Sequence, residues 1–184
     1  MPCFITGEAN CKCRVPCANQ QVMYNKDMFR KLWTDHVLYT KLVMMDIMEH
    51  LPAKADIDRL YLNSEEISAH LSKIIGNDKA ERLTALLRDH TRNMITGAVA
   101  LSNKDISLFK SHTMLMFQNG DQTAAFLSTS KLPKESLKTM WTELNDLIMD
   151  LAIAQYHHDS KLASKVFDAY HNHMLNMSDT LLSA

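Results

Sequence analysis

Leu32–Leu42 reads LWTDHVLYTKL, and the opening pattern of this stretch returns twice further along the chain. LLRDHTRNMIT begins at residue 86 and MWTELNDLIMD at residue 140, so the three starts lie 54 residues apart. Each stretch begins with two large apolar residues, followed by Thr or Arg and then an acidic residue. The first two then have a histidine, His36 and His90, where the third has Leu144. The repeat raises the question of whether these histidines bind a ligand or pack in a core.

Apolar residues in and around these stretches recur at intervals of three and four, which is the spacing of one helix face. The pattern predicts long helices over residues 25–50, 79–101, 134–157 and 160–182. Between them we expect shorter helices, one near 57–62, one from a cap at Asn63 to Gly76, one near 104–117 and one from a cap at Asp121. Asp159 is expected to cap the last long helix.

Antiparallel packing of the long helices is the simplest way to bury their apolar faces. We therefore expect an all-α, up-and-down helical bundle of long helices with shorter capped helices between them. A second echo, NSEEISAHLS at 63–72 and NGDQTAAFLS at 119–128, indicates either an internal duplication or the common recurrence of helix caps and apolar faces. The domain organisation predicted is an irregular cysteine-bearing N-terminal segment, 1–24, and a helical-bundle domain, 25–184.

The composition of the 184-residue chain argues against several classes of function. Its net charge is −1, from 20 basic and 21 acidic residues, and no basic cluster indicates a nucleic-acid partner. No apolar run approaches the roughly 18 residues that suggest a membrane span. The first residues lack the basic and apolar regions of a secretory signal. We therefore expect a cytoplasmic protein, or a component of the virion if the chain is viral.

Helical bundles can build metal sites from side chains on facing helices. His36 and His90 are the first candidates because they occupy matching places on apolar faces, and neutral imidazole suits zinc and other transition metals. Further ligands would come from this set: His171, His173, His112, Asp35, Asp89, Asp46 and Glu49. The alternative is that each imidazole hydrogen-bonds a Tyr, Thr or carboxylate across the core, since the spacing carries no coordination geometry.

All four cysteines lie near the N-terminus, at Cys3, Cys11, Cys13 and Cys17. Their spacing, C-x7-C-x-C-x3-C, is not the paired C-x2-C of a typical zinc finger, although four thiolates could close around one zinc ion. They could instead form two disulfides in an oxidising setting or in a virion, or stay as free thiols. With free thiols, the segment is expected to anchor a protein partner or a homo-oligomer.

Four stretches together resemble a family of small, mostly bacterial helical-bundle proteins with no established activity. The stretches are LWTDHVLYTKLVM, LNSEEISAHLSKIIGNDKAERLTALLRDH, NGDQTAAFLS and HNHMLNMSDTL, and the shared motifs include Trp-x-x-His-Val-x-x-Thr and Leu-Leu-x-Asp-His. The resemblance spans residues 30–182 and implies that His36, His90, His171 and His173 are shared histidines. Family members often have a further histidine near residue 142 or 144, which this chain lacks.

These observations favour a soluble helical-bundle binding protein that holds a metal ion or small ligand through inward-facing histidines. The alternative is a structural or interaction component of a larger assembly, a cellular complex or a virus particle, anchored by the cysteine-bearing segment. No nucleophile elbow, phosphate loop or Rossmann-type glycine pattern indicates an enzyme. A metal-dependent hydrolase or oxidase is expected only if the metal site is real.

Overall fold

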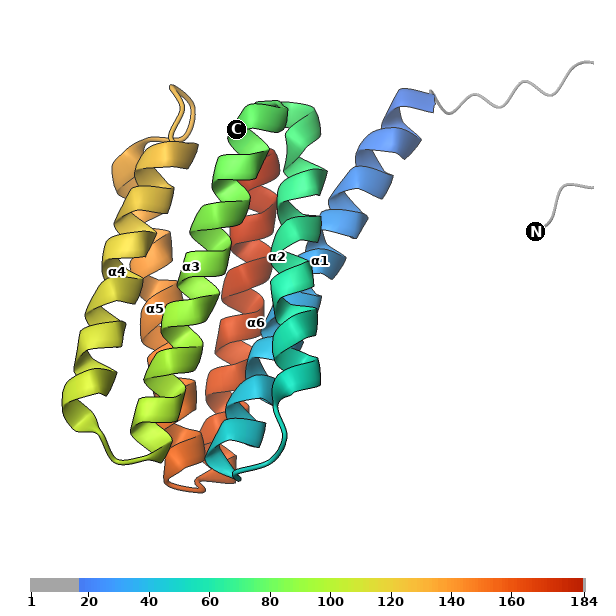
Figure 1. Ribbon diagram of the computed structural model, residues 1–184. Coiled ribbons are helices and arrows are strands. Elements are labelled where there is room, and N and C mark those ends of the chain that lie inside the picture. The colour runs from blue at the N-terminus through green and yellow to red at the C-terminus, as the bar shows by residue number, and fades with distance from the viewer. Residues whose placement is uncertain (1–16, 184) are drawn as a thin grey trace, which may run out of the picture.

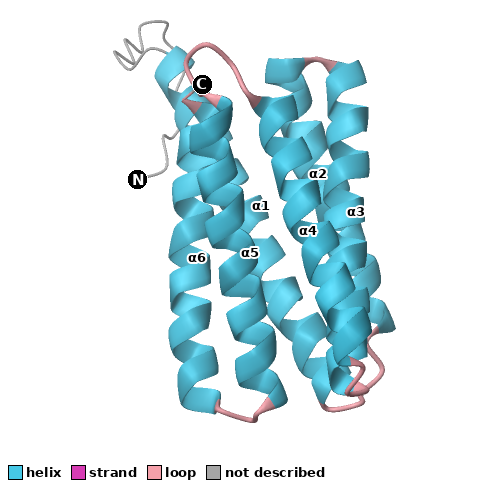
Figure 2. Ribbon diagram, turned by 90° about the vertical axis from the view of Figure 1, so that its left-hand side faces the viewer, coloured by secondary structure: helices cyan, strands magenta, loops and turns pink. Residues whose placement is uncertain are grey.

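The computed structural model describes residues 17–183, with side chains from Asn25 onward. This part of the chain is all-α, as predicted, and its helices run alternately up and down (Figure 1). The helices are α1 (Cys17–Met48), α2 (Lys54–Ile75), α3 (Asn77–Ser102), α4 (Ile106–Leu127), α5 (Lys134–Tyr156) and α6 (Ser160–Leu182). Short loops connect them at the two ends of the bundle (Figure 2). Among these helices, none combines the length and apolar character that a membrane span needs.

The bundle consists of three helical hairpins, α1–α2, α3–α4 and α5–α6. Helices α1, α3 and α5 each contact the other two, whereas no contact within residues 17–183 joins α2, α4 and α6 to one another. Each even-numbered helix packs against two odd-numbered ones, and α6 closes the ring by contacting α1. The hairpins therefore surround a pseudo-threefold centre formed by α1, α3 and α5.

The 54-residue period of the sequence is the period of this arrangement. Side chains at equivalent places on α1, α3 and α5, 54 residues apart, are all buried, and each set of three is called a layer here. Four of these layers are Trp33, Leu87 and Trp141; His36, His90 and Leu144; Val37, Thr91 and Asn145; and Thr40, Met94 and Ile148. Each hairpin thus contributes one side chain to each layer, and the three occurrences of the pattern in the sequence correspond to the three hairpins.

The predicted caps at Asn63 and Asp121 were wrong, because α2 and α4 run unbroken through both positions. Asn63 is fully buried in the middle of α2, and Asp121 forms an ion pair of 2.9 Å with Lys138 of α5. The cap at Asp159 is confirmed, since its side chain accepts a hydrogen bond of 2.9 Å from the N–H of Leu162. Helix α1 begins at Cys17, so residues 17–24, predicted to be irregular, belong to a helix.

The three loops that follow α1, α3 and α5 are built alike and lie at the lower end of the bundle in Figure 1. In the first, the N–H groups of residues 50 and 51 donate to the carbonyls of residues 47 and 46, and the same two bonds recur in the other loops. This pattern is the Schellman motif. Its left-handed position is occupied by His50, Lys104 and His158, with φ angles of 54°, 62° and 53°. Glycine is usual there because a Cβ atom disfavours positive φ.

Candidate functional site

The layer containing His36 and His90 is the candidate site. His36 is 5% exposed and His90 is 2% exposed, and their helices α1 and α3 are in contact. This confirms the prediction that both histidines are buried on neighbouring helices. Each imidazole also meets a tryptophan edge-on, at ring-centre distances of 5.7 Å for His36 with Trp33 and 5.6 Å for His90 with Trp141. The layer is therefore polar at two places and enclosed by aromatic rings.

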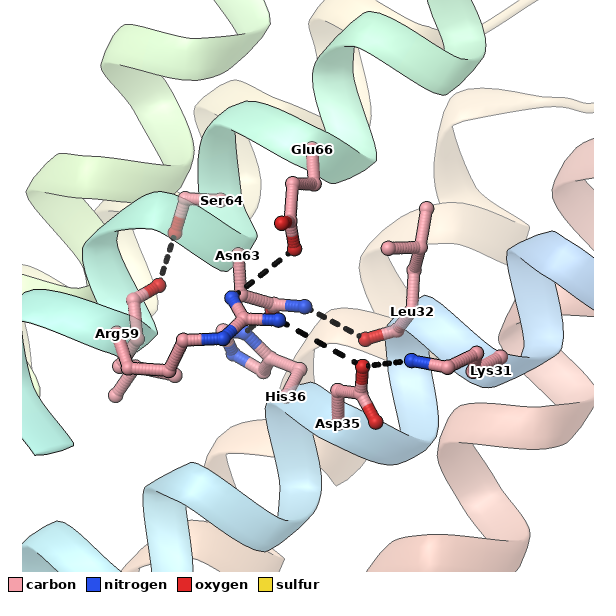
Figure 3. Close-up of polar contacts among 9 residues, drawn as sticks. Lys31, Leu32, Asp35, His36, Arg59, Asn63, Ser64 and Glu66 are labelled. Atoms are coloured by element: carbon pink, nitrogen blue, oxygen red, sulfur yellow. Dashed lines mark hydrogen bonds and ion pairs between the residues drawn. The ribbon is translucent and has the colours of Figure 1, made fainter.

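A side chain of α2 fixes the orientation of His36 (Figure 3). Asn63 donates through Nδ2 to the carbonyl of Leu32, at 2.9 Å, so its Oδ1 is turned toward the imidazole. The distance from Oδ1 to Nδ1 of His36 is 2.9 Å, and a carboxamide oxygen can only accept, so Nδ1 carries the proton. Nε2 is then the unprotonated nitrogen of the ring.

Ion pairs on the outer side of α1 and α2 surround this hydrogen bond (Figure 3). Arg59 lies 3.7 Å from Asp35 of α1 and 3.0 Å from Glu66 of α2, and Lys31 lies 2.6 Å from Asp35. These side chains are partly exposed, and such pairs contribute up to about 1 kcal/mol each. Of these pairs, Arg59–Asp35 is the one that joins the two helices, and it helps to fix the register of α1 against α2 beside Asn63.

The second hairpin repeats the arrangement around His36 but lacks the hydrogen bond between the asparagine and the imidazole. Asn119 of α4 donates through Nδ2 to the carbonyl of Leu86, at 3.0 Å, as Asn63 does to Leu32. In the second hairpin, however, Oδ1 of Asn119 and both ring nitrogens of His90 are buried without a hydrogen-bond partner among the described residues. The hydrogen bond that orients the first imidazole is therefore missing for the second.

The third hairpin has the same backbone contact but no imidazole in the layer. His173 of α6 donates through Nε2 to the carbonyl of Met140, at 2.9 Å, and so takes the part that Asn63 and Asn119 take in the other hairpins. At the place of His36 and His90 stands Leu144, which is buried. The layer consequently has two imidazoles and one apolar side chain.

The structure does not bring the four predicted histidines together. His173 is engaged with the backbone of α5, while Nε2 of His171 lies 3.1 Å from Oγ1 of Thr34 and its ring stacks on Phe167. Within the described part of the chain, no group of three or more His, Cys, Asp or Glu residues is placed to hold a metal ion.

The cysteine site stays a prediction. Cys3, Cys11 and Cys13 lie outside the described residues, and of Cys17 only the backbone, the first residue of α1, is described. The structure therefore does not test whether the cysteines bind zinc, form disulfides or remain free thiols.

Burial keeps both imidazoles of the layer uncharged. It lowers the pKa of His36 to about 4, although the hydrogen bond to Asn63 opposes this effect. Burial lowers the pKa of His90 to about 3, and the electrostatic influence of His36 adds to the effect. At neutral pH both are neutral imidazoles, the form that accepts hydrogen bonds and coordinates transition metals.

Sequence reasoning missed the role of the side chains that bond to the backbone of the neighbouring helix. Asn63 and Asn119 both belong to the second echo, but the sequence predicted Asn63 as a helix cap and placed Asn119 between two short helices. The available signal was the matching offsets, because Leu32 and Leu86 lie 54 residues apart and the two asparagines 56. Two residues that keep the same separation in two hairpins are expected to be in contact in both.

Comparison with protein-family models, with curated proteins and with solved structures found no match to this chain. The family resemblance inferred from the motifs therefore stays a prediction.

Proposed function

We propose that the protein is a binding protein whose ligand contacts the inward-facing pair His36 and His90. The observation that supports this proposal is in the second hairpin, where three buried atoms of His90 and Asn119 have no hydrogen-bond partner among the described residues. A buried polar atom without a hydrogen-bond partner costs about 1–3 kcal/mol. A ligand that pairs with these atoms recovers that cost, so the free energy favours an occupant at the layer.

Two kinds of ligand suit the layer. A transition-metal ion such as zinc or copper would be coordinated by two neutral imidazoles, and water or another exogenous group would complete its shell, because Leu144 fills the third place. A small hydrogen-bonding molecule needs no third protein ligand and also pairs with the free carboxamide oxygen of Asn119. Both kinds contact the same two histidines.

The experiment uses the two tryptophans of the chain, since each contacts one of the two histidines. The full-length protein is examined by elemental analysis and native mass spectrometry as purified, and is then titrated with Zn²⁺ and Cu⁺ while tryptophan emission is recorded. The test variant is His90→Leu, which copies the third hairpin at Leu144. The matched control is His171→Gln, which removes an imidazole outside the layer.

We expect a bound metal or organic mass in the wild type and in His171→Gln, with a change in tryptophan emission, and neither in His90→Leu. A metal identifies the ion, and a dissociable organic mass identifies the other kind of ligand. Equal ligand content in His90→Leu and the wild type, or no ligand and no response to either ion, would contradict the proposal.

The second candidate is an interaction component of a larger assembly, and exposed apolar side chains on α4 favour it. Leu108 and Leu115 are each 41% exposed and lie seven residues apart, on the same side of the helix. We expect Leu115→Glu to lower the mass of any complex seen by light scattering at micromolar concentration, whereas His90→Leu leaves that mass unchanged. A wild-type protein that stays monomeric, with or without its N-terminal segment, would speak against this candidate.

A further inference from the structure

The lower end of the bundle carries an open pocket on the pseudo-threefold centre, with a volume of about 490 Å³. Its lining repeats the 54-residue period twice, once in the last residues of α1, α3 and α5 and once in the loops that follow them. The lining residues are Met48, Ser102 and Tyr156 from the helices, and His50, Lys104, His157 and His158 from the loops. All three hairpins therefore meet at this end pocket.

The basic side chains of the end pocket occupy the strained positions of the three Schellman loops. His50, Lys104 and His158 all have positive φ, where glycine would fit without strain. Basic residues within the last turn of a helix would also interact favourably with the helix dipole. The last turns of α1, α3 and α5 contain none. Within residues 17–183, His50, Lys104 and His158 are the non-glycine residues with positive φ, and all three line the pocket.

The polar groups around the end pocket favour an anion over a cation. In each loop, two carbonyls from the last turn of the preceding helix already accept loop N–H groups, which leaves fewer acceptors for a cation. Asp105 and Asp159 accept from backbone N–H groups as helix caps, and Glu49 lies 3.2 Å from Nδ1 of His158. Lys104 has no ion pair within residues 25–183 and can donate to an oxyanion.

A second pocket of about 340 Å³ adjoins the first, since Met48 and His158 line both. It lies between α1, α5 and α6, and its apolar lining includes Met45, Met48, Ala154 and Ala163. Gln155 lines it too, is 9% exposed, and has neither its amide nitrogen nor its amide oxygen paired among the described residues. An apolar pocket with an unpaired amide has the character of a small-molecule site.

We propose that the two pockets together bind a small organic anion. Its phosphate or carboxylate group occupies the end pocket and accepts from Lys104 and the imidazoles, and its apolar part lies in the side pocket over Met45 and Met48. Gln155 hydrogen-bonds a polar group of the ligand. This site is separate from the histidine layer and does not depend on the function proposed for it.

The test is a titration of the full-length protein, followed by isothermal calorimetry and by amide chemical shifts. The probes are hexyl phosphate, hexanoate, inorganic phosphate and hexanol. The main variant is Lys104→Gly, which removes the charge and relieves the positive φ, so it is expected to fold at least as well as the wild type. The matched control is Lys131→Gly, which removes an exposed lysine from the loop at the opposite end of the bundle. A further variant is Gln155→Leu, which introduces the residue found at the equivalent position of the second hairpin, Leu101.

We expect hexyl phosphate or hexanoate to bind and to shift amides in the three loops and around Gln155. The tighter of the two identifies the charged group. Lys104→Gly should weaken binding roughly tenfold, the order expected for one charge-assisted hydrogen bond, and Gln155→Leu should weaken it several-fold. Lys131→Gly and His90→Leu should leave it unchanged. The proposal is overturned if neither anion binds, if hexanol binds as tightly as hexyl phosphate, or if Lys104→Gly and Lys131→Gly have equal effects.

Discussion

Acidification should destabilise this protein through the two buried histidines well before most carboxylates titrate. The pKa of His36 is about 4 and that of His90 about 3 in the folded protein, against about 6.5 for an unfolded histidine. The unfolded chain therefore binds protons below pH 6.5 that the folded chain excludes. The stability contributed by these neutral imidazoles is fully present above pH 6.5 and is lost as pH falls toward 4.

The size of the loss follows from the same two values. Between the unfolded and folded pKa, each histidine lowers the free energy of unfolding by about 1.4 kcal/mol per pH unit. At pH 5, which is about 1.5 units below the unfolded pKa, each costs about 2 kcal/mol, and the pair costs about 4 kcal/mol. A domain of this kind is stable by only about 5–15 kcal/mol in total, so the effect should be large.

Urea unfolding at pH 7, 6 and 5, followed by circular dichroism, measures this slope. His90→Leu should be about as stable as the wild type or more stable at pH 7, because it removes two buried polar atoms that have no partner in the described part of the chain. It should also lose about 2 kcal/mol less between pH 7 and pH 5. His157→Asn, at an exposed position, should follow the wild type. If His90→Leu and the wild type had the same pH dependence, His90 would not be buried as a neutral imidazole, and the reasoning about the layer would fail.

Three further predictions concern single side chains of the core. Leu144→His should complete a three-imidazole layer, so that zinc at 100 times its dissociation constant raises the unfolding free energy by about 2.7 kcal/mol. Urea titration with and without metal measures this change, and no zinc effect would mean that the three positions do not converge. Gln155→Leu should stabilise the fold by about 1–3 kcal/mol, because it removes two buried atoms without a partner among the described residues. Leu101 already occupies the equivalent position in the second hairpin, and a lower thermal melting temperature would contradict the prediction. Asn63→Ala should cost about 1 kcal/mol more than Asn119→Ala, since only Asn63 also bonds an imidazole; equal costs in urea unfolding would show that the bond to His36 contributes nothing.

The sequence was sufficient to predict the four long helices and the burial of the two histidines. Apolar spacing of three and four is a local property, and it places Trp33, His36 and Thr40 on one face whatever the rest of the chain does. The layers then follow, because three helices with the same spacing bury equivalent positions. The 54-residue period contained this information, and its third occurrence at Met140 marked the third hairpin.

The contacts between helices could not be predicted in the same way. Asn favours both helix caps and buried hydrogen bonds, and only the neighbouring helix decides between them. For Asn63 the deciding partner is the carbonyl of Leu32, which no residue pattern identifies as a hydrogen-bond acceptor. The end pocket was missed for a related reason, because its basic residues lie in three loops that are far apart in the sequence and meet only after the hairpins pack.

The closure of the ring by α6 against α1 also bears on chain order. Lys26 and Arg30 near the start of α1 each pair with Asp179 near the end of α6, both at 3.1 Å, so these two helices are held together where the first and last hairpins meet. A circularly permuted chain that begins at Asn77, runs through α6 and enters α1 through a short linker would keep every hairpin and every layer. The order α1 to α6 is then one of three equivalent hairpin orders for the same ring.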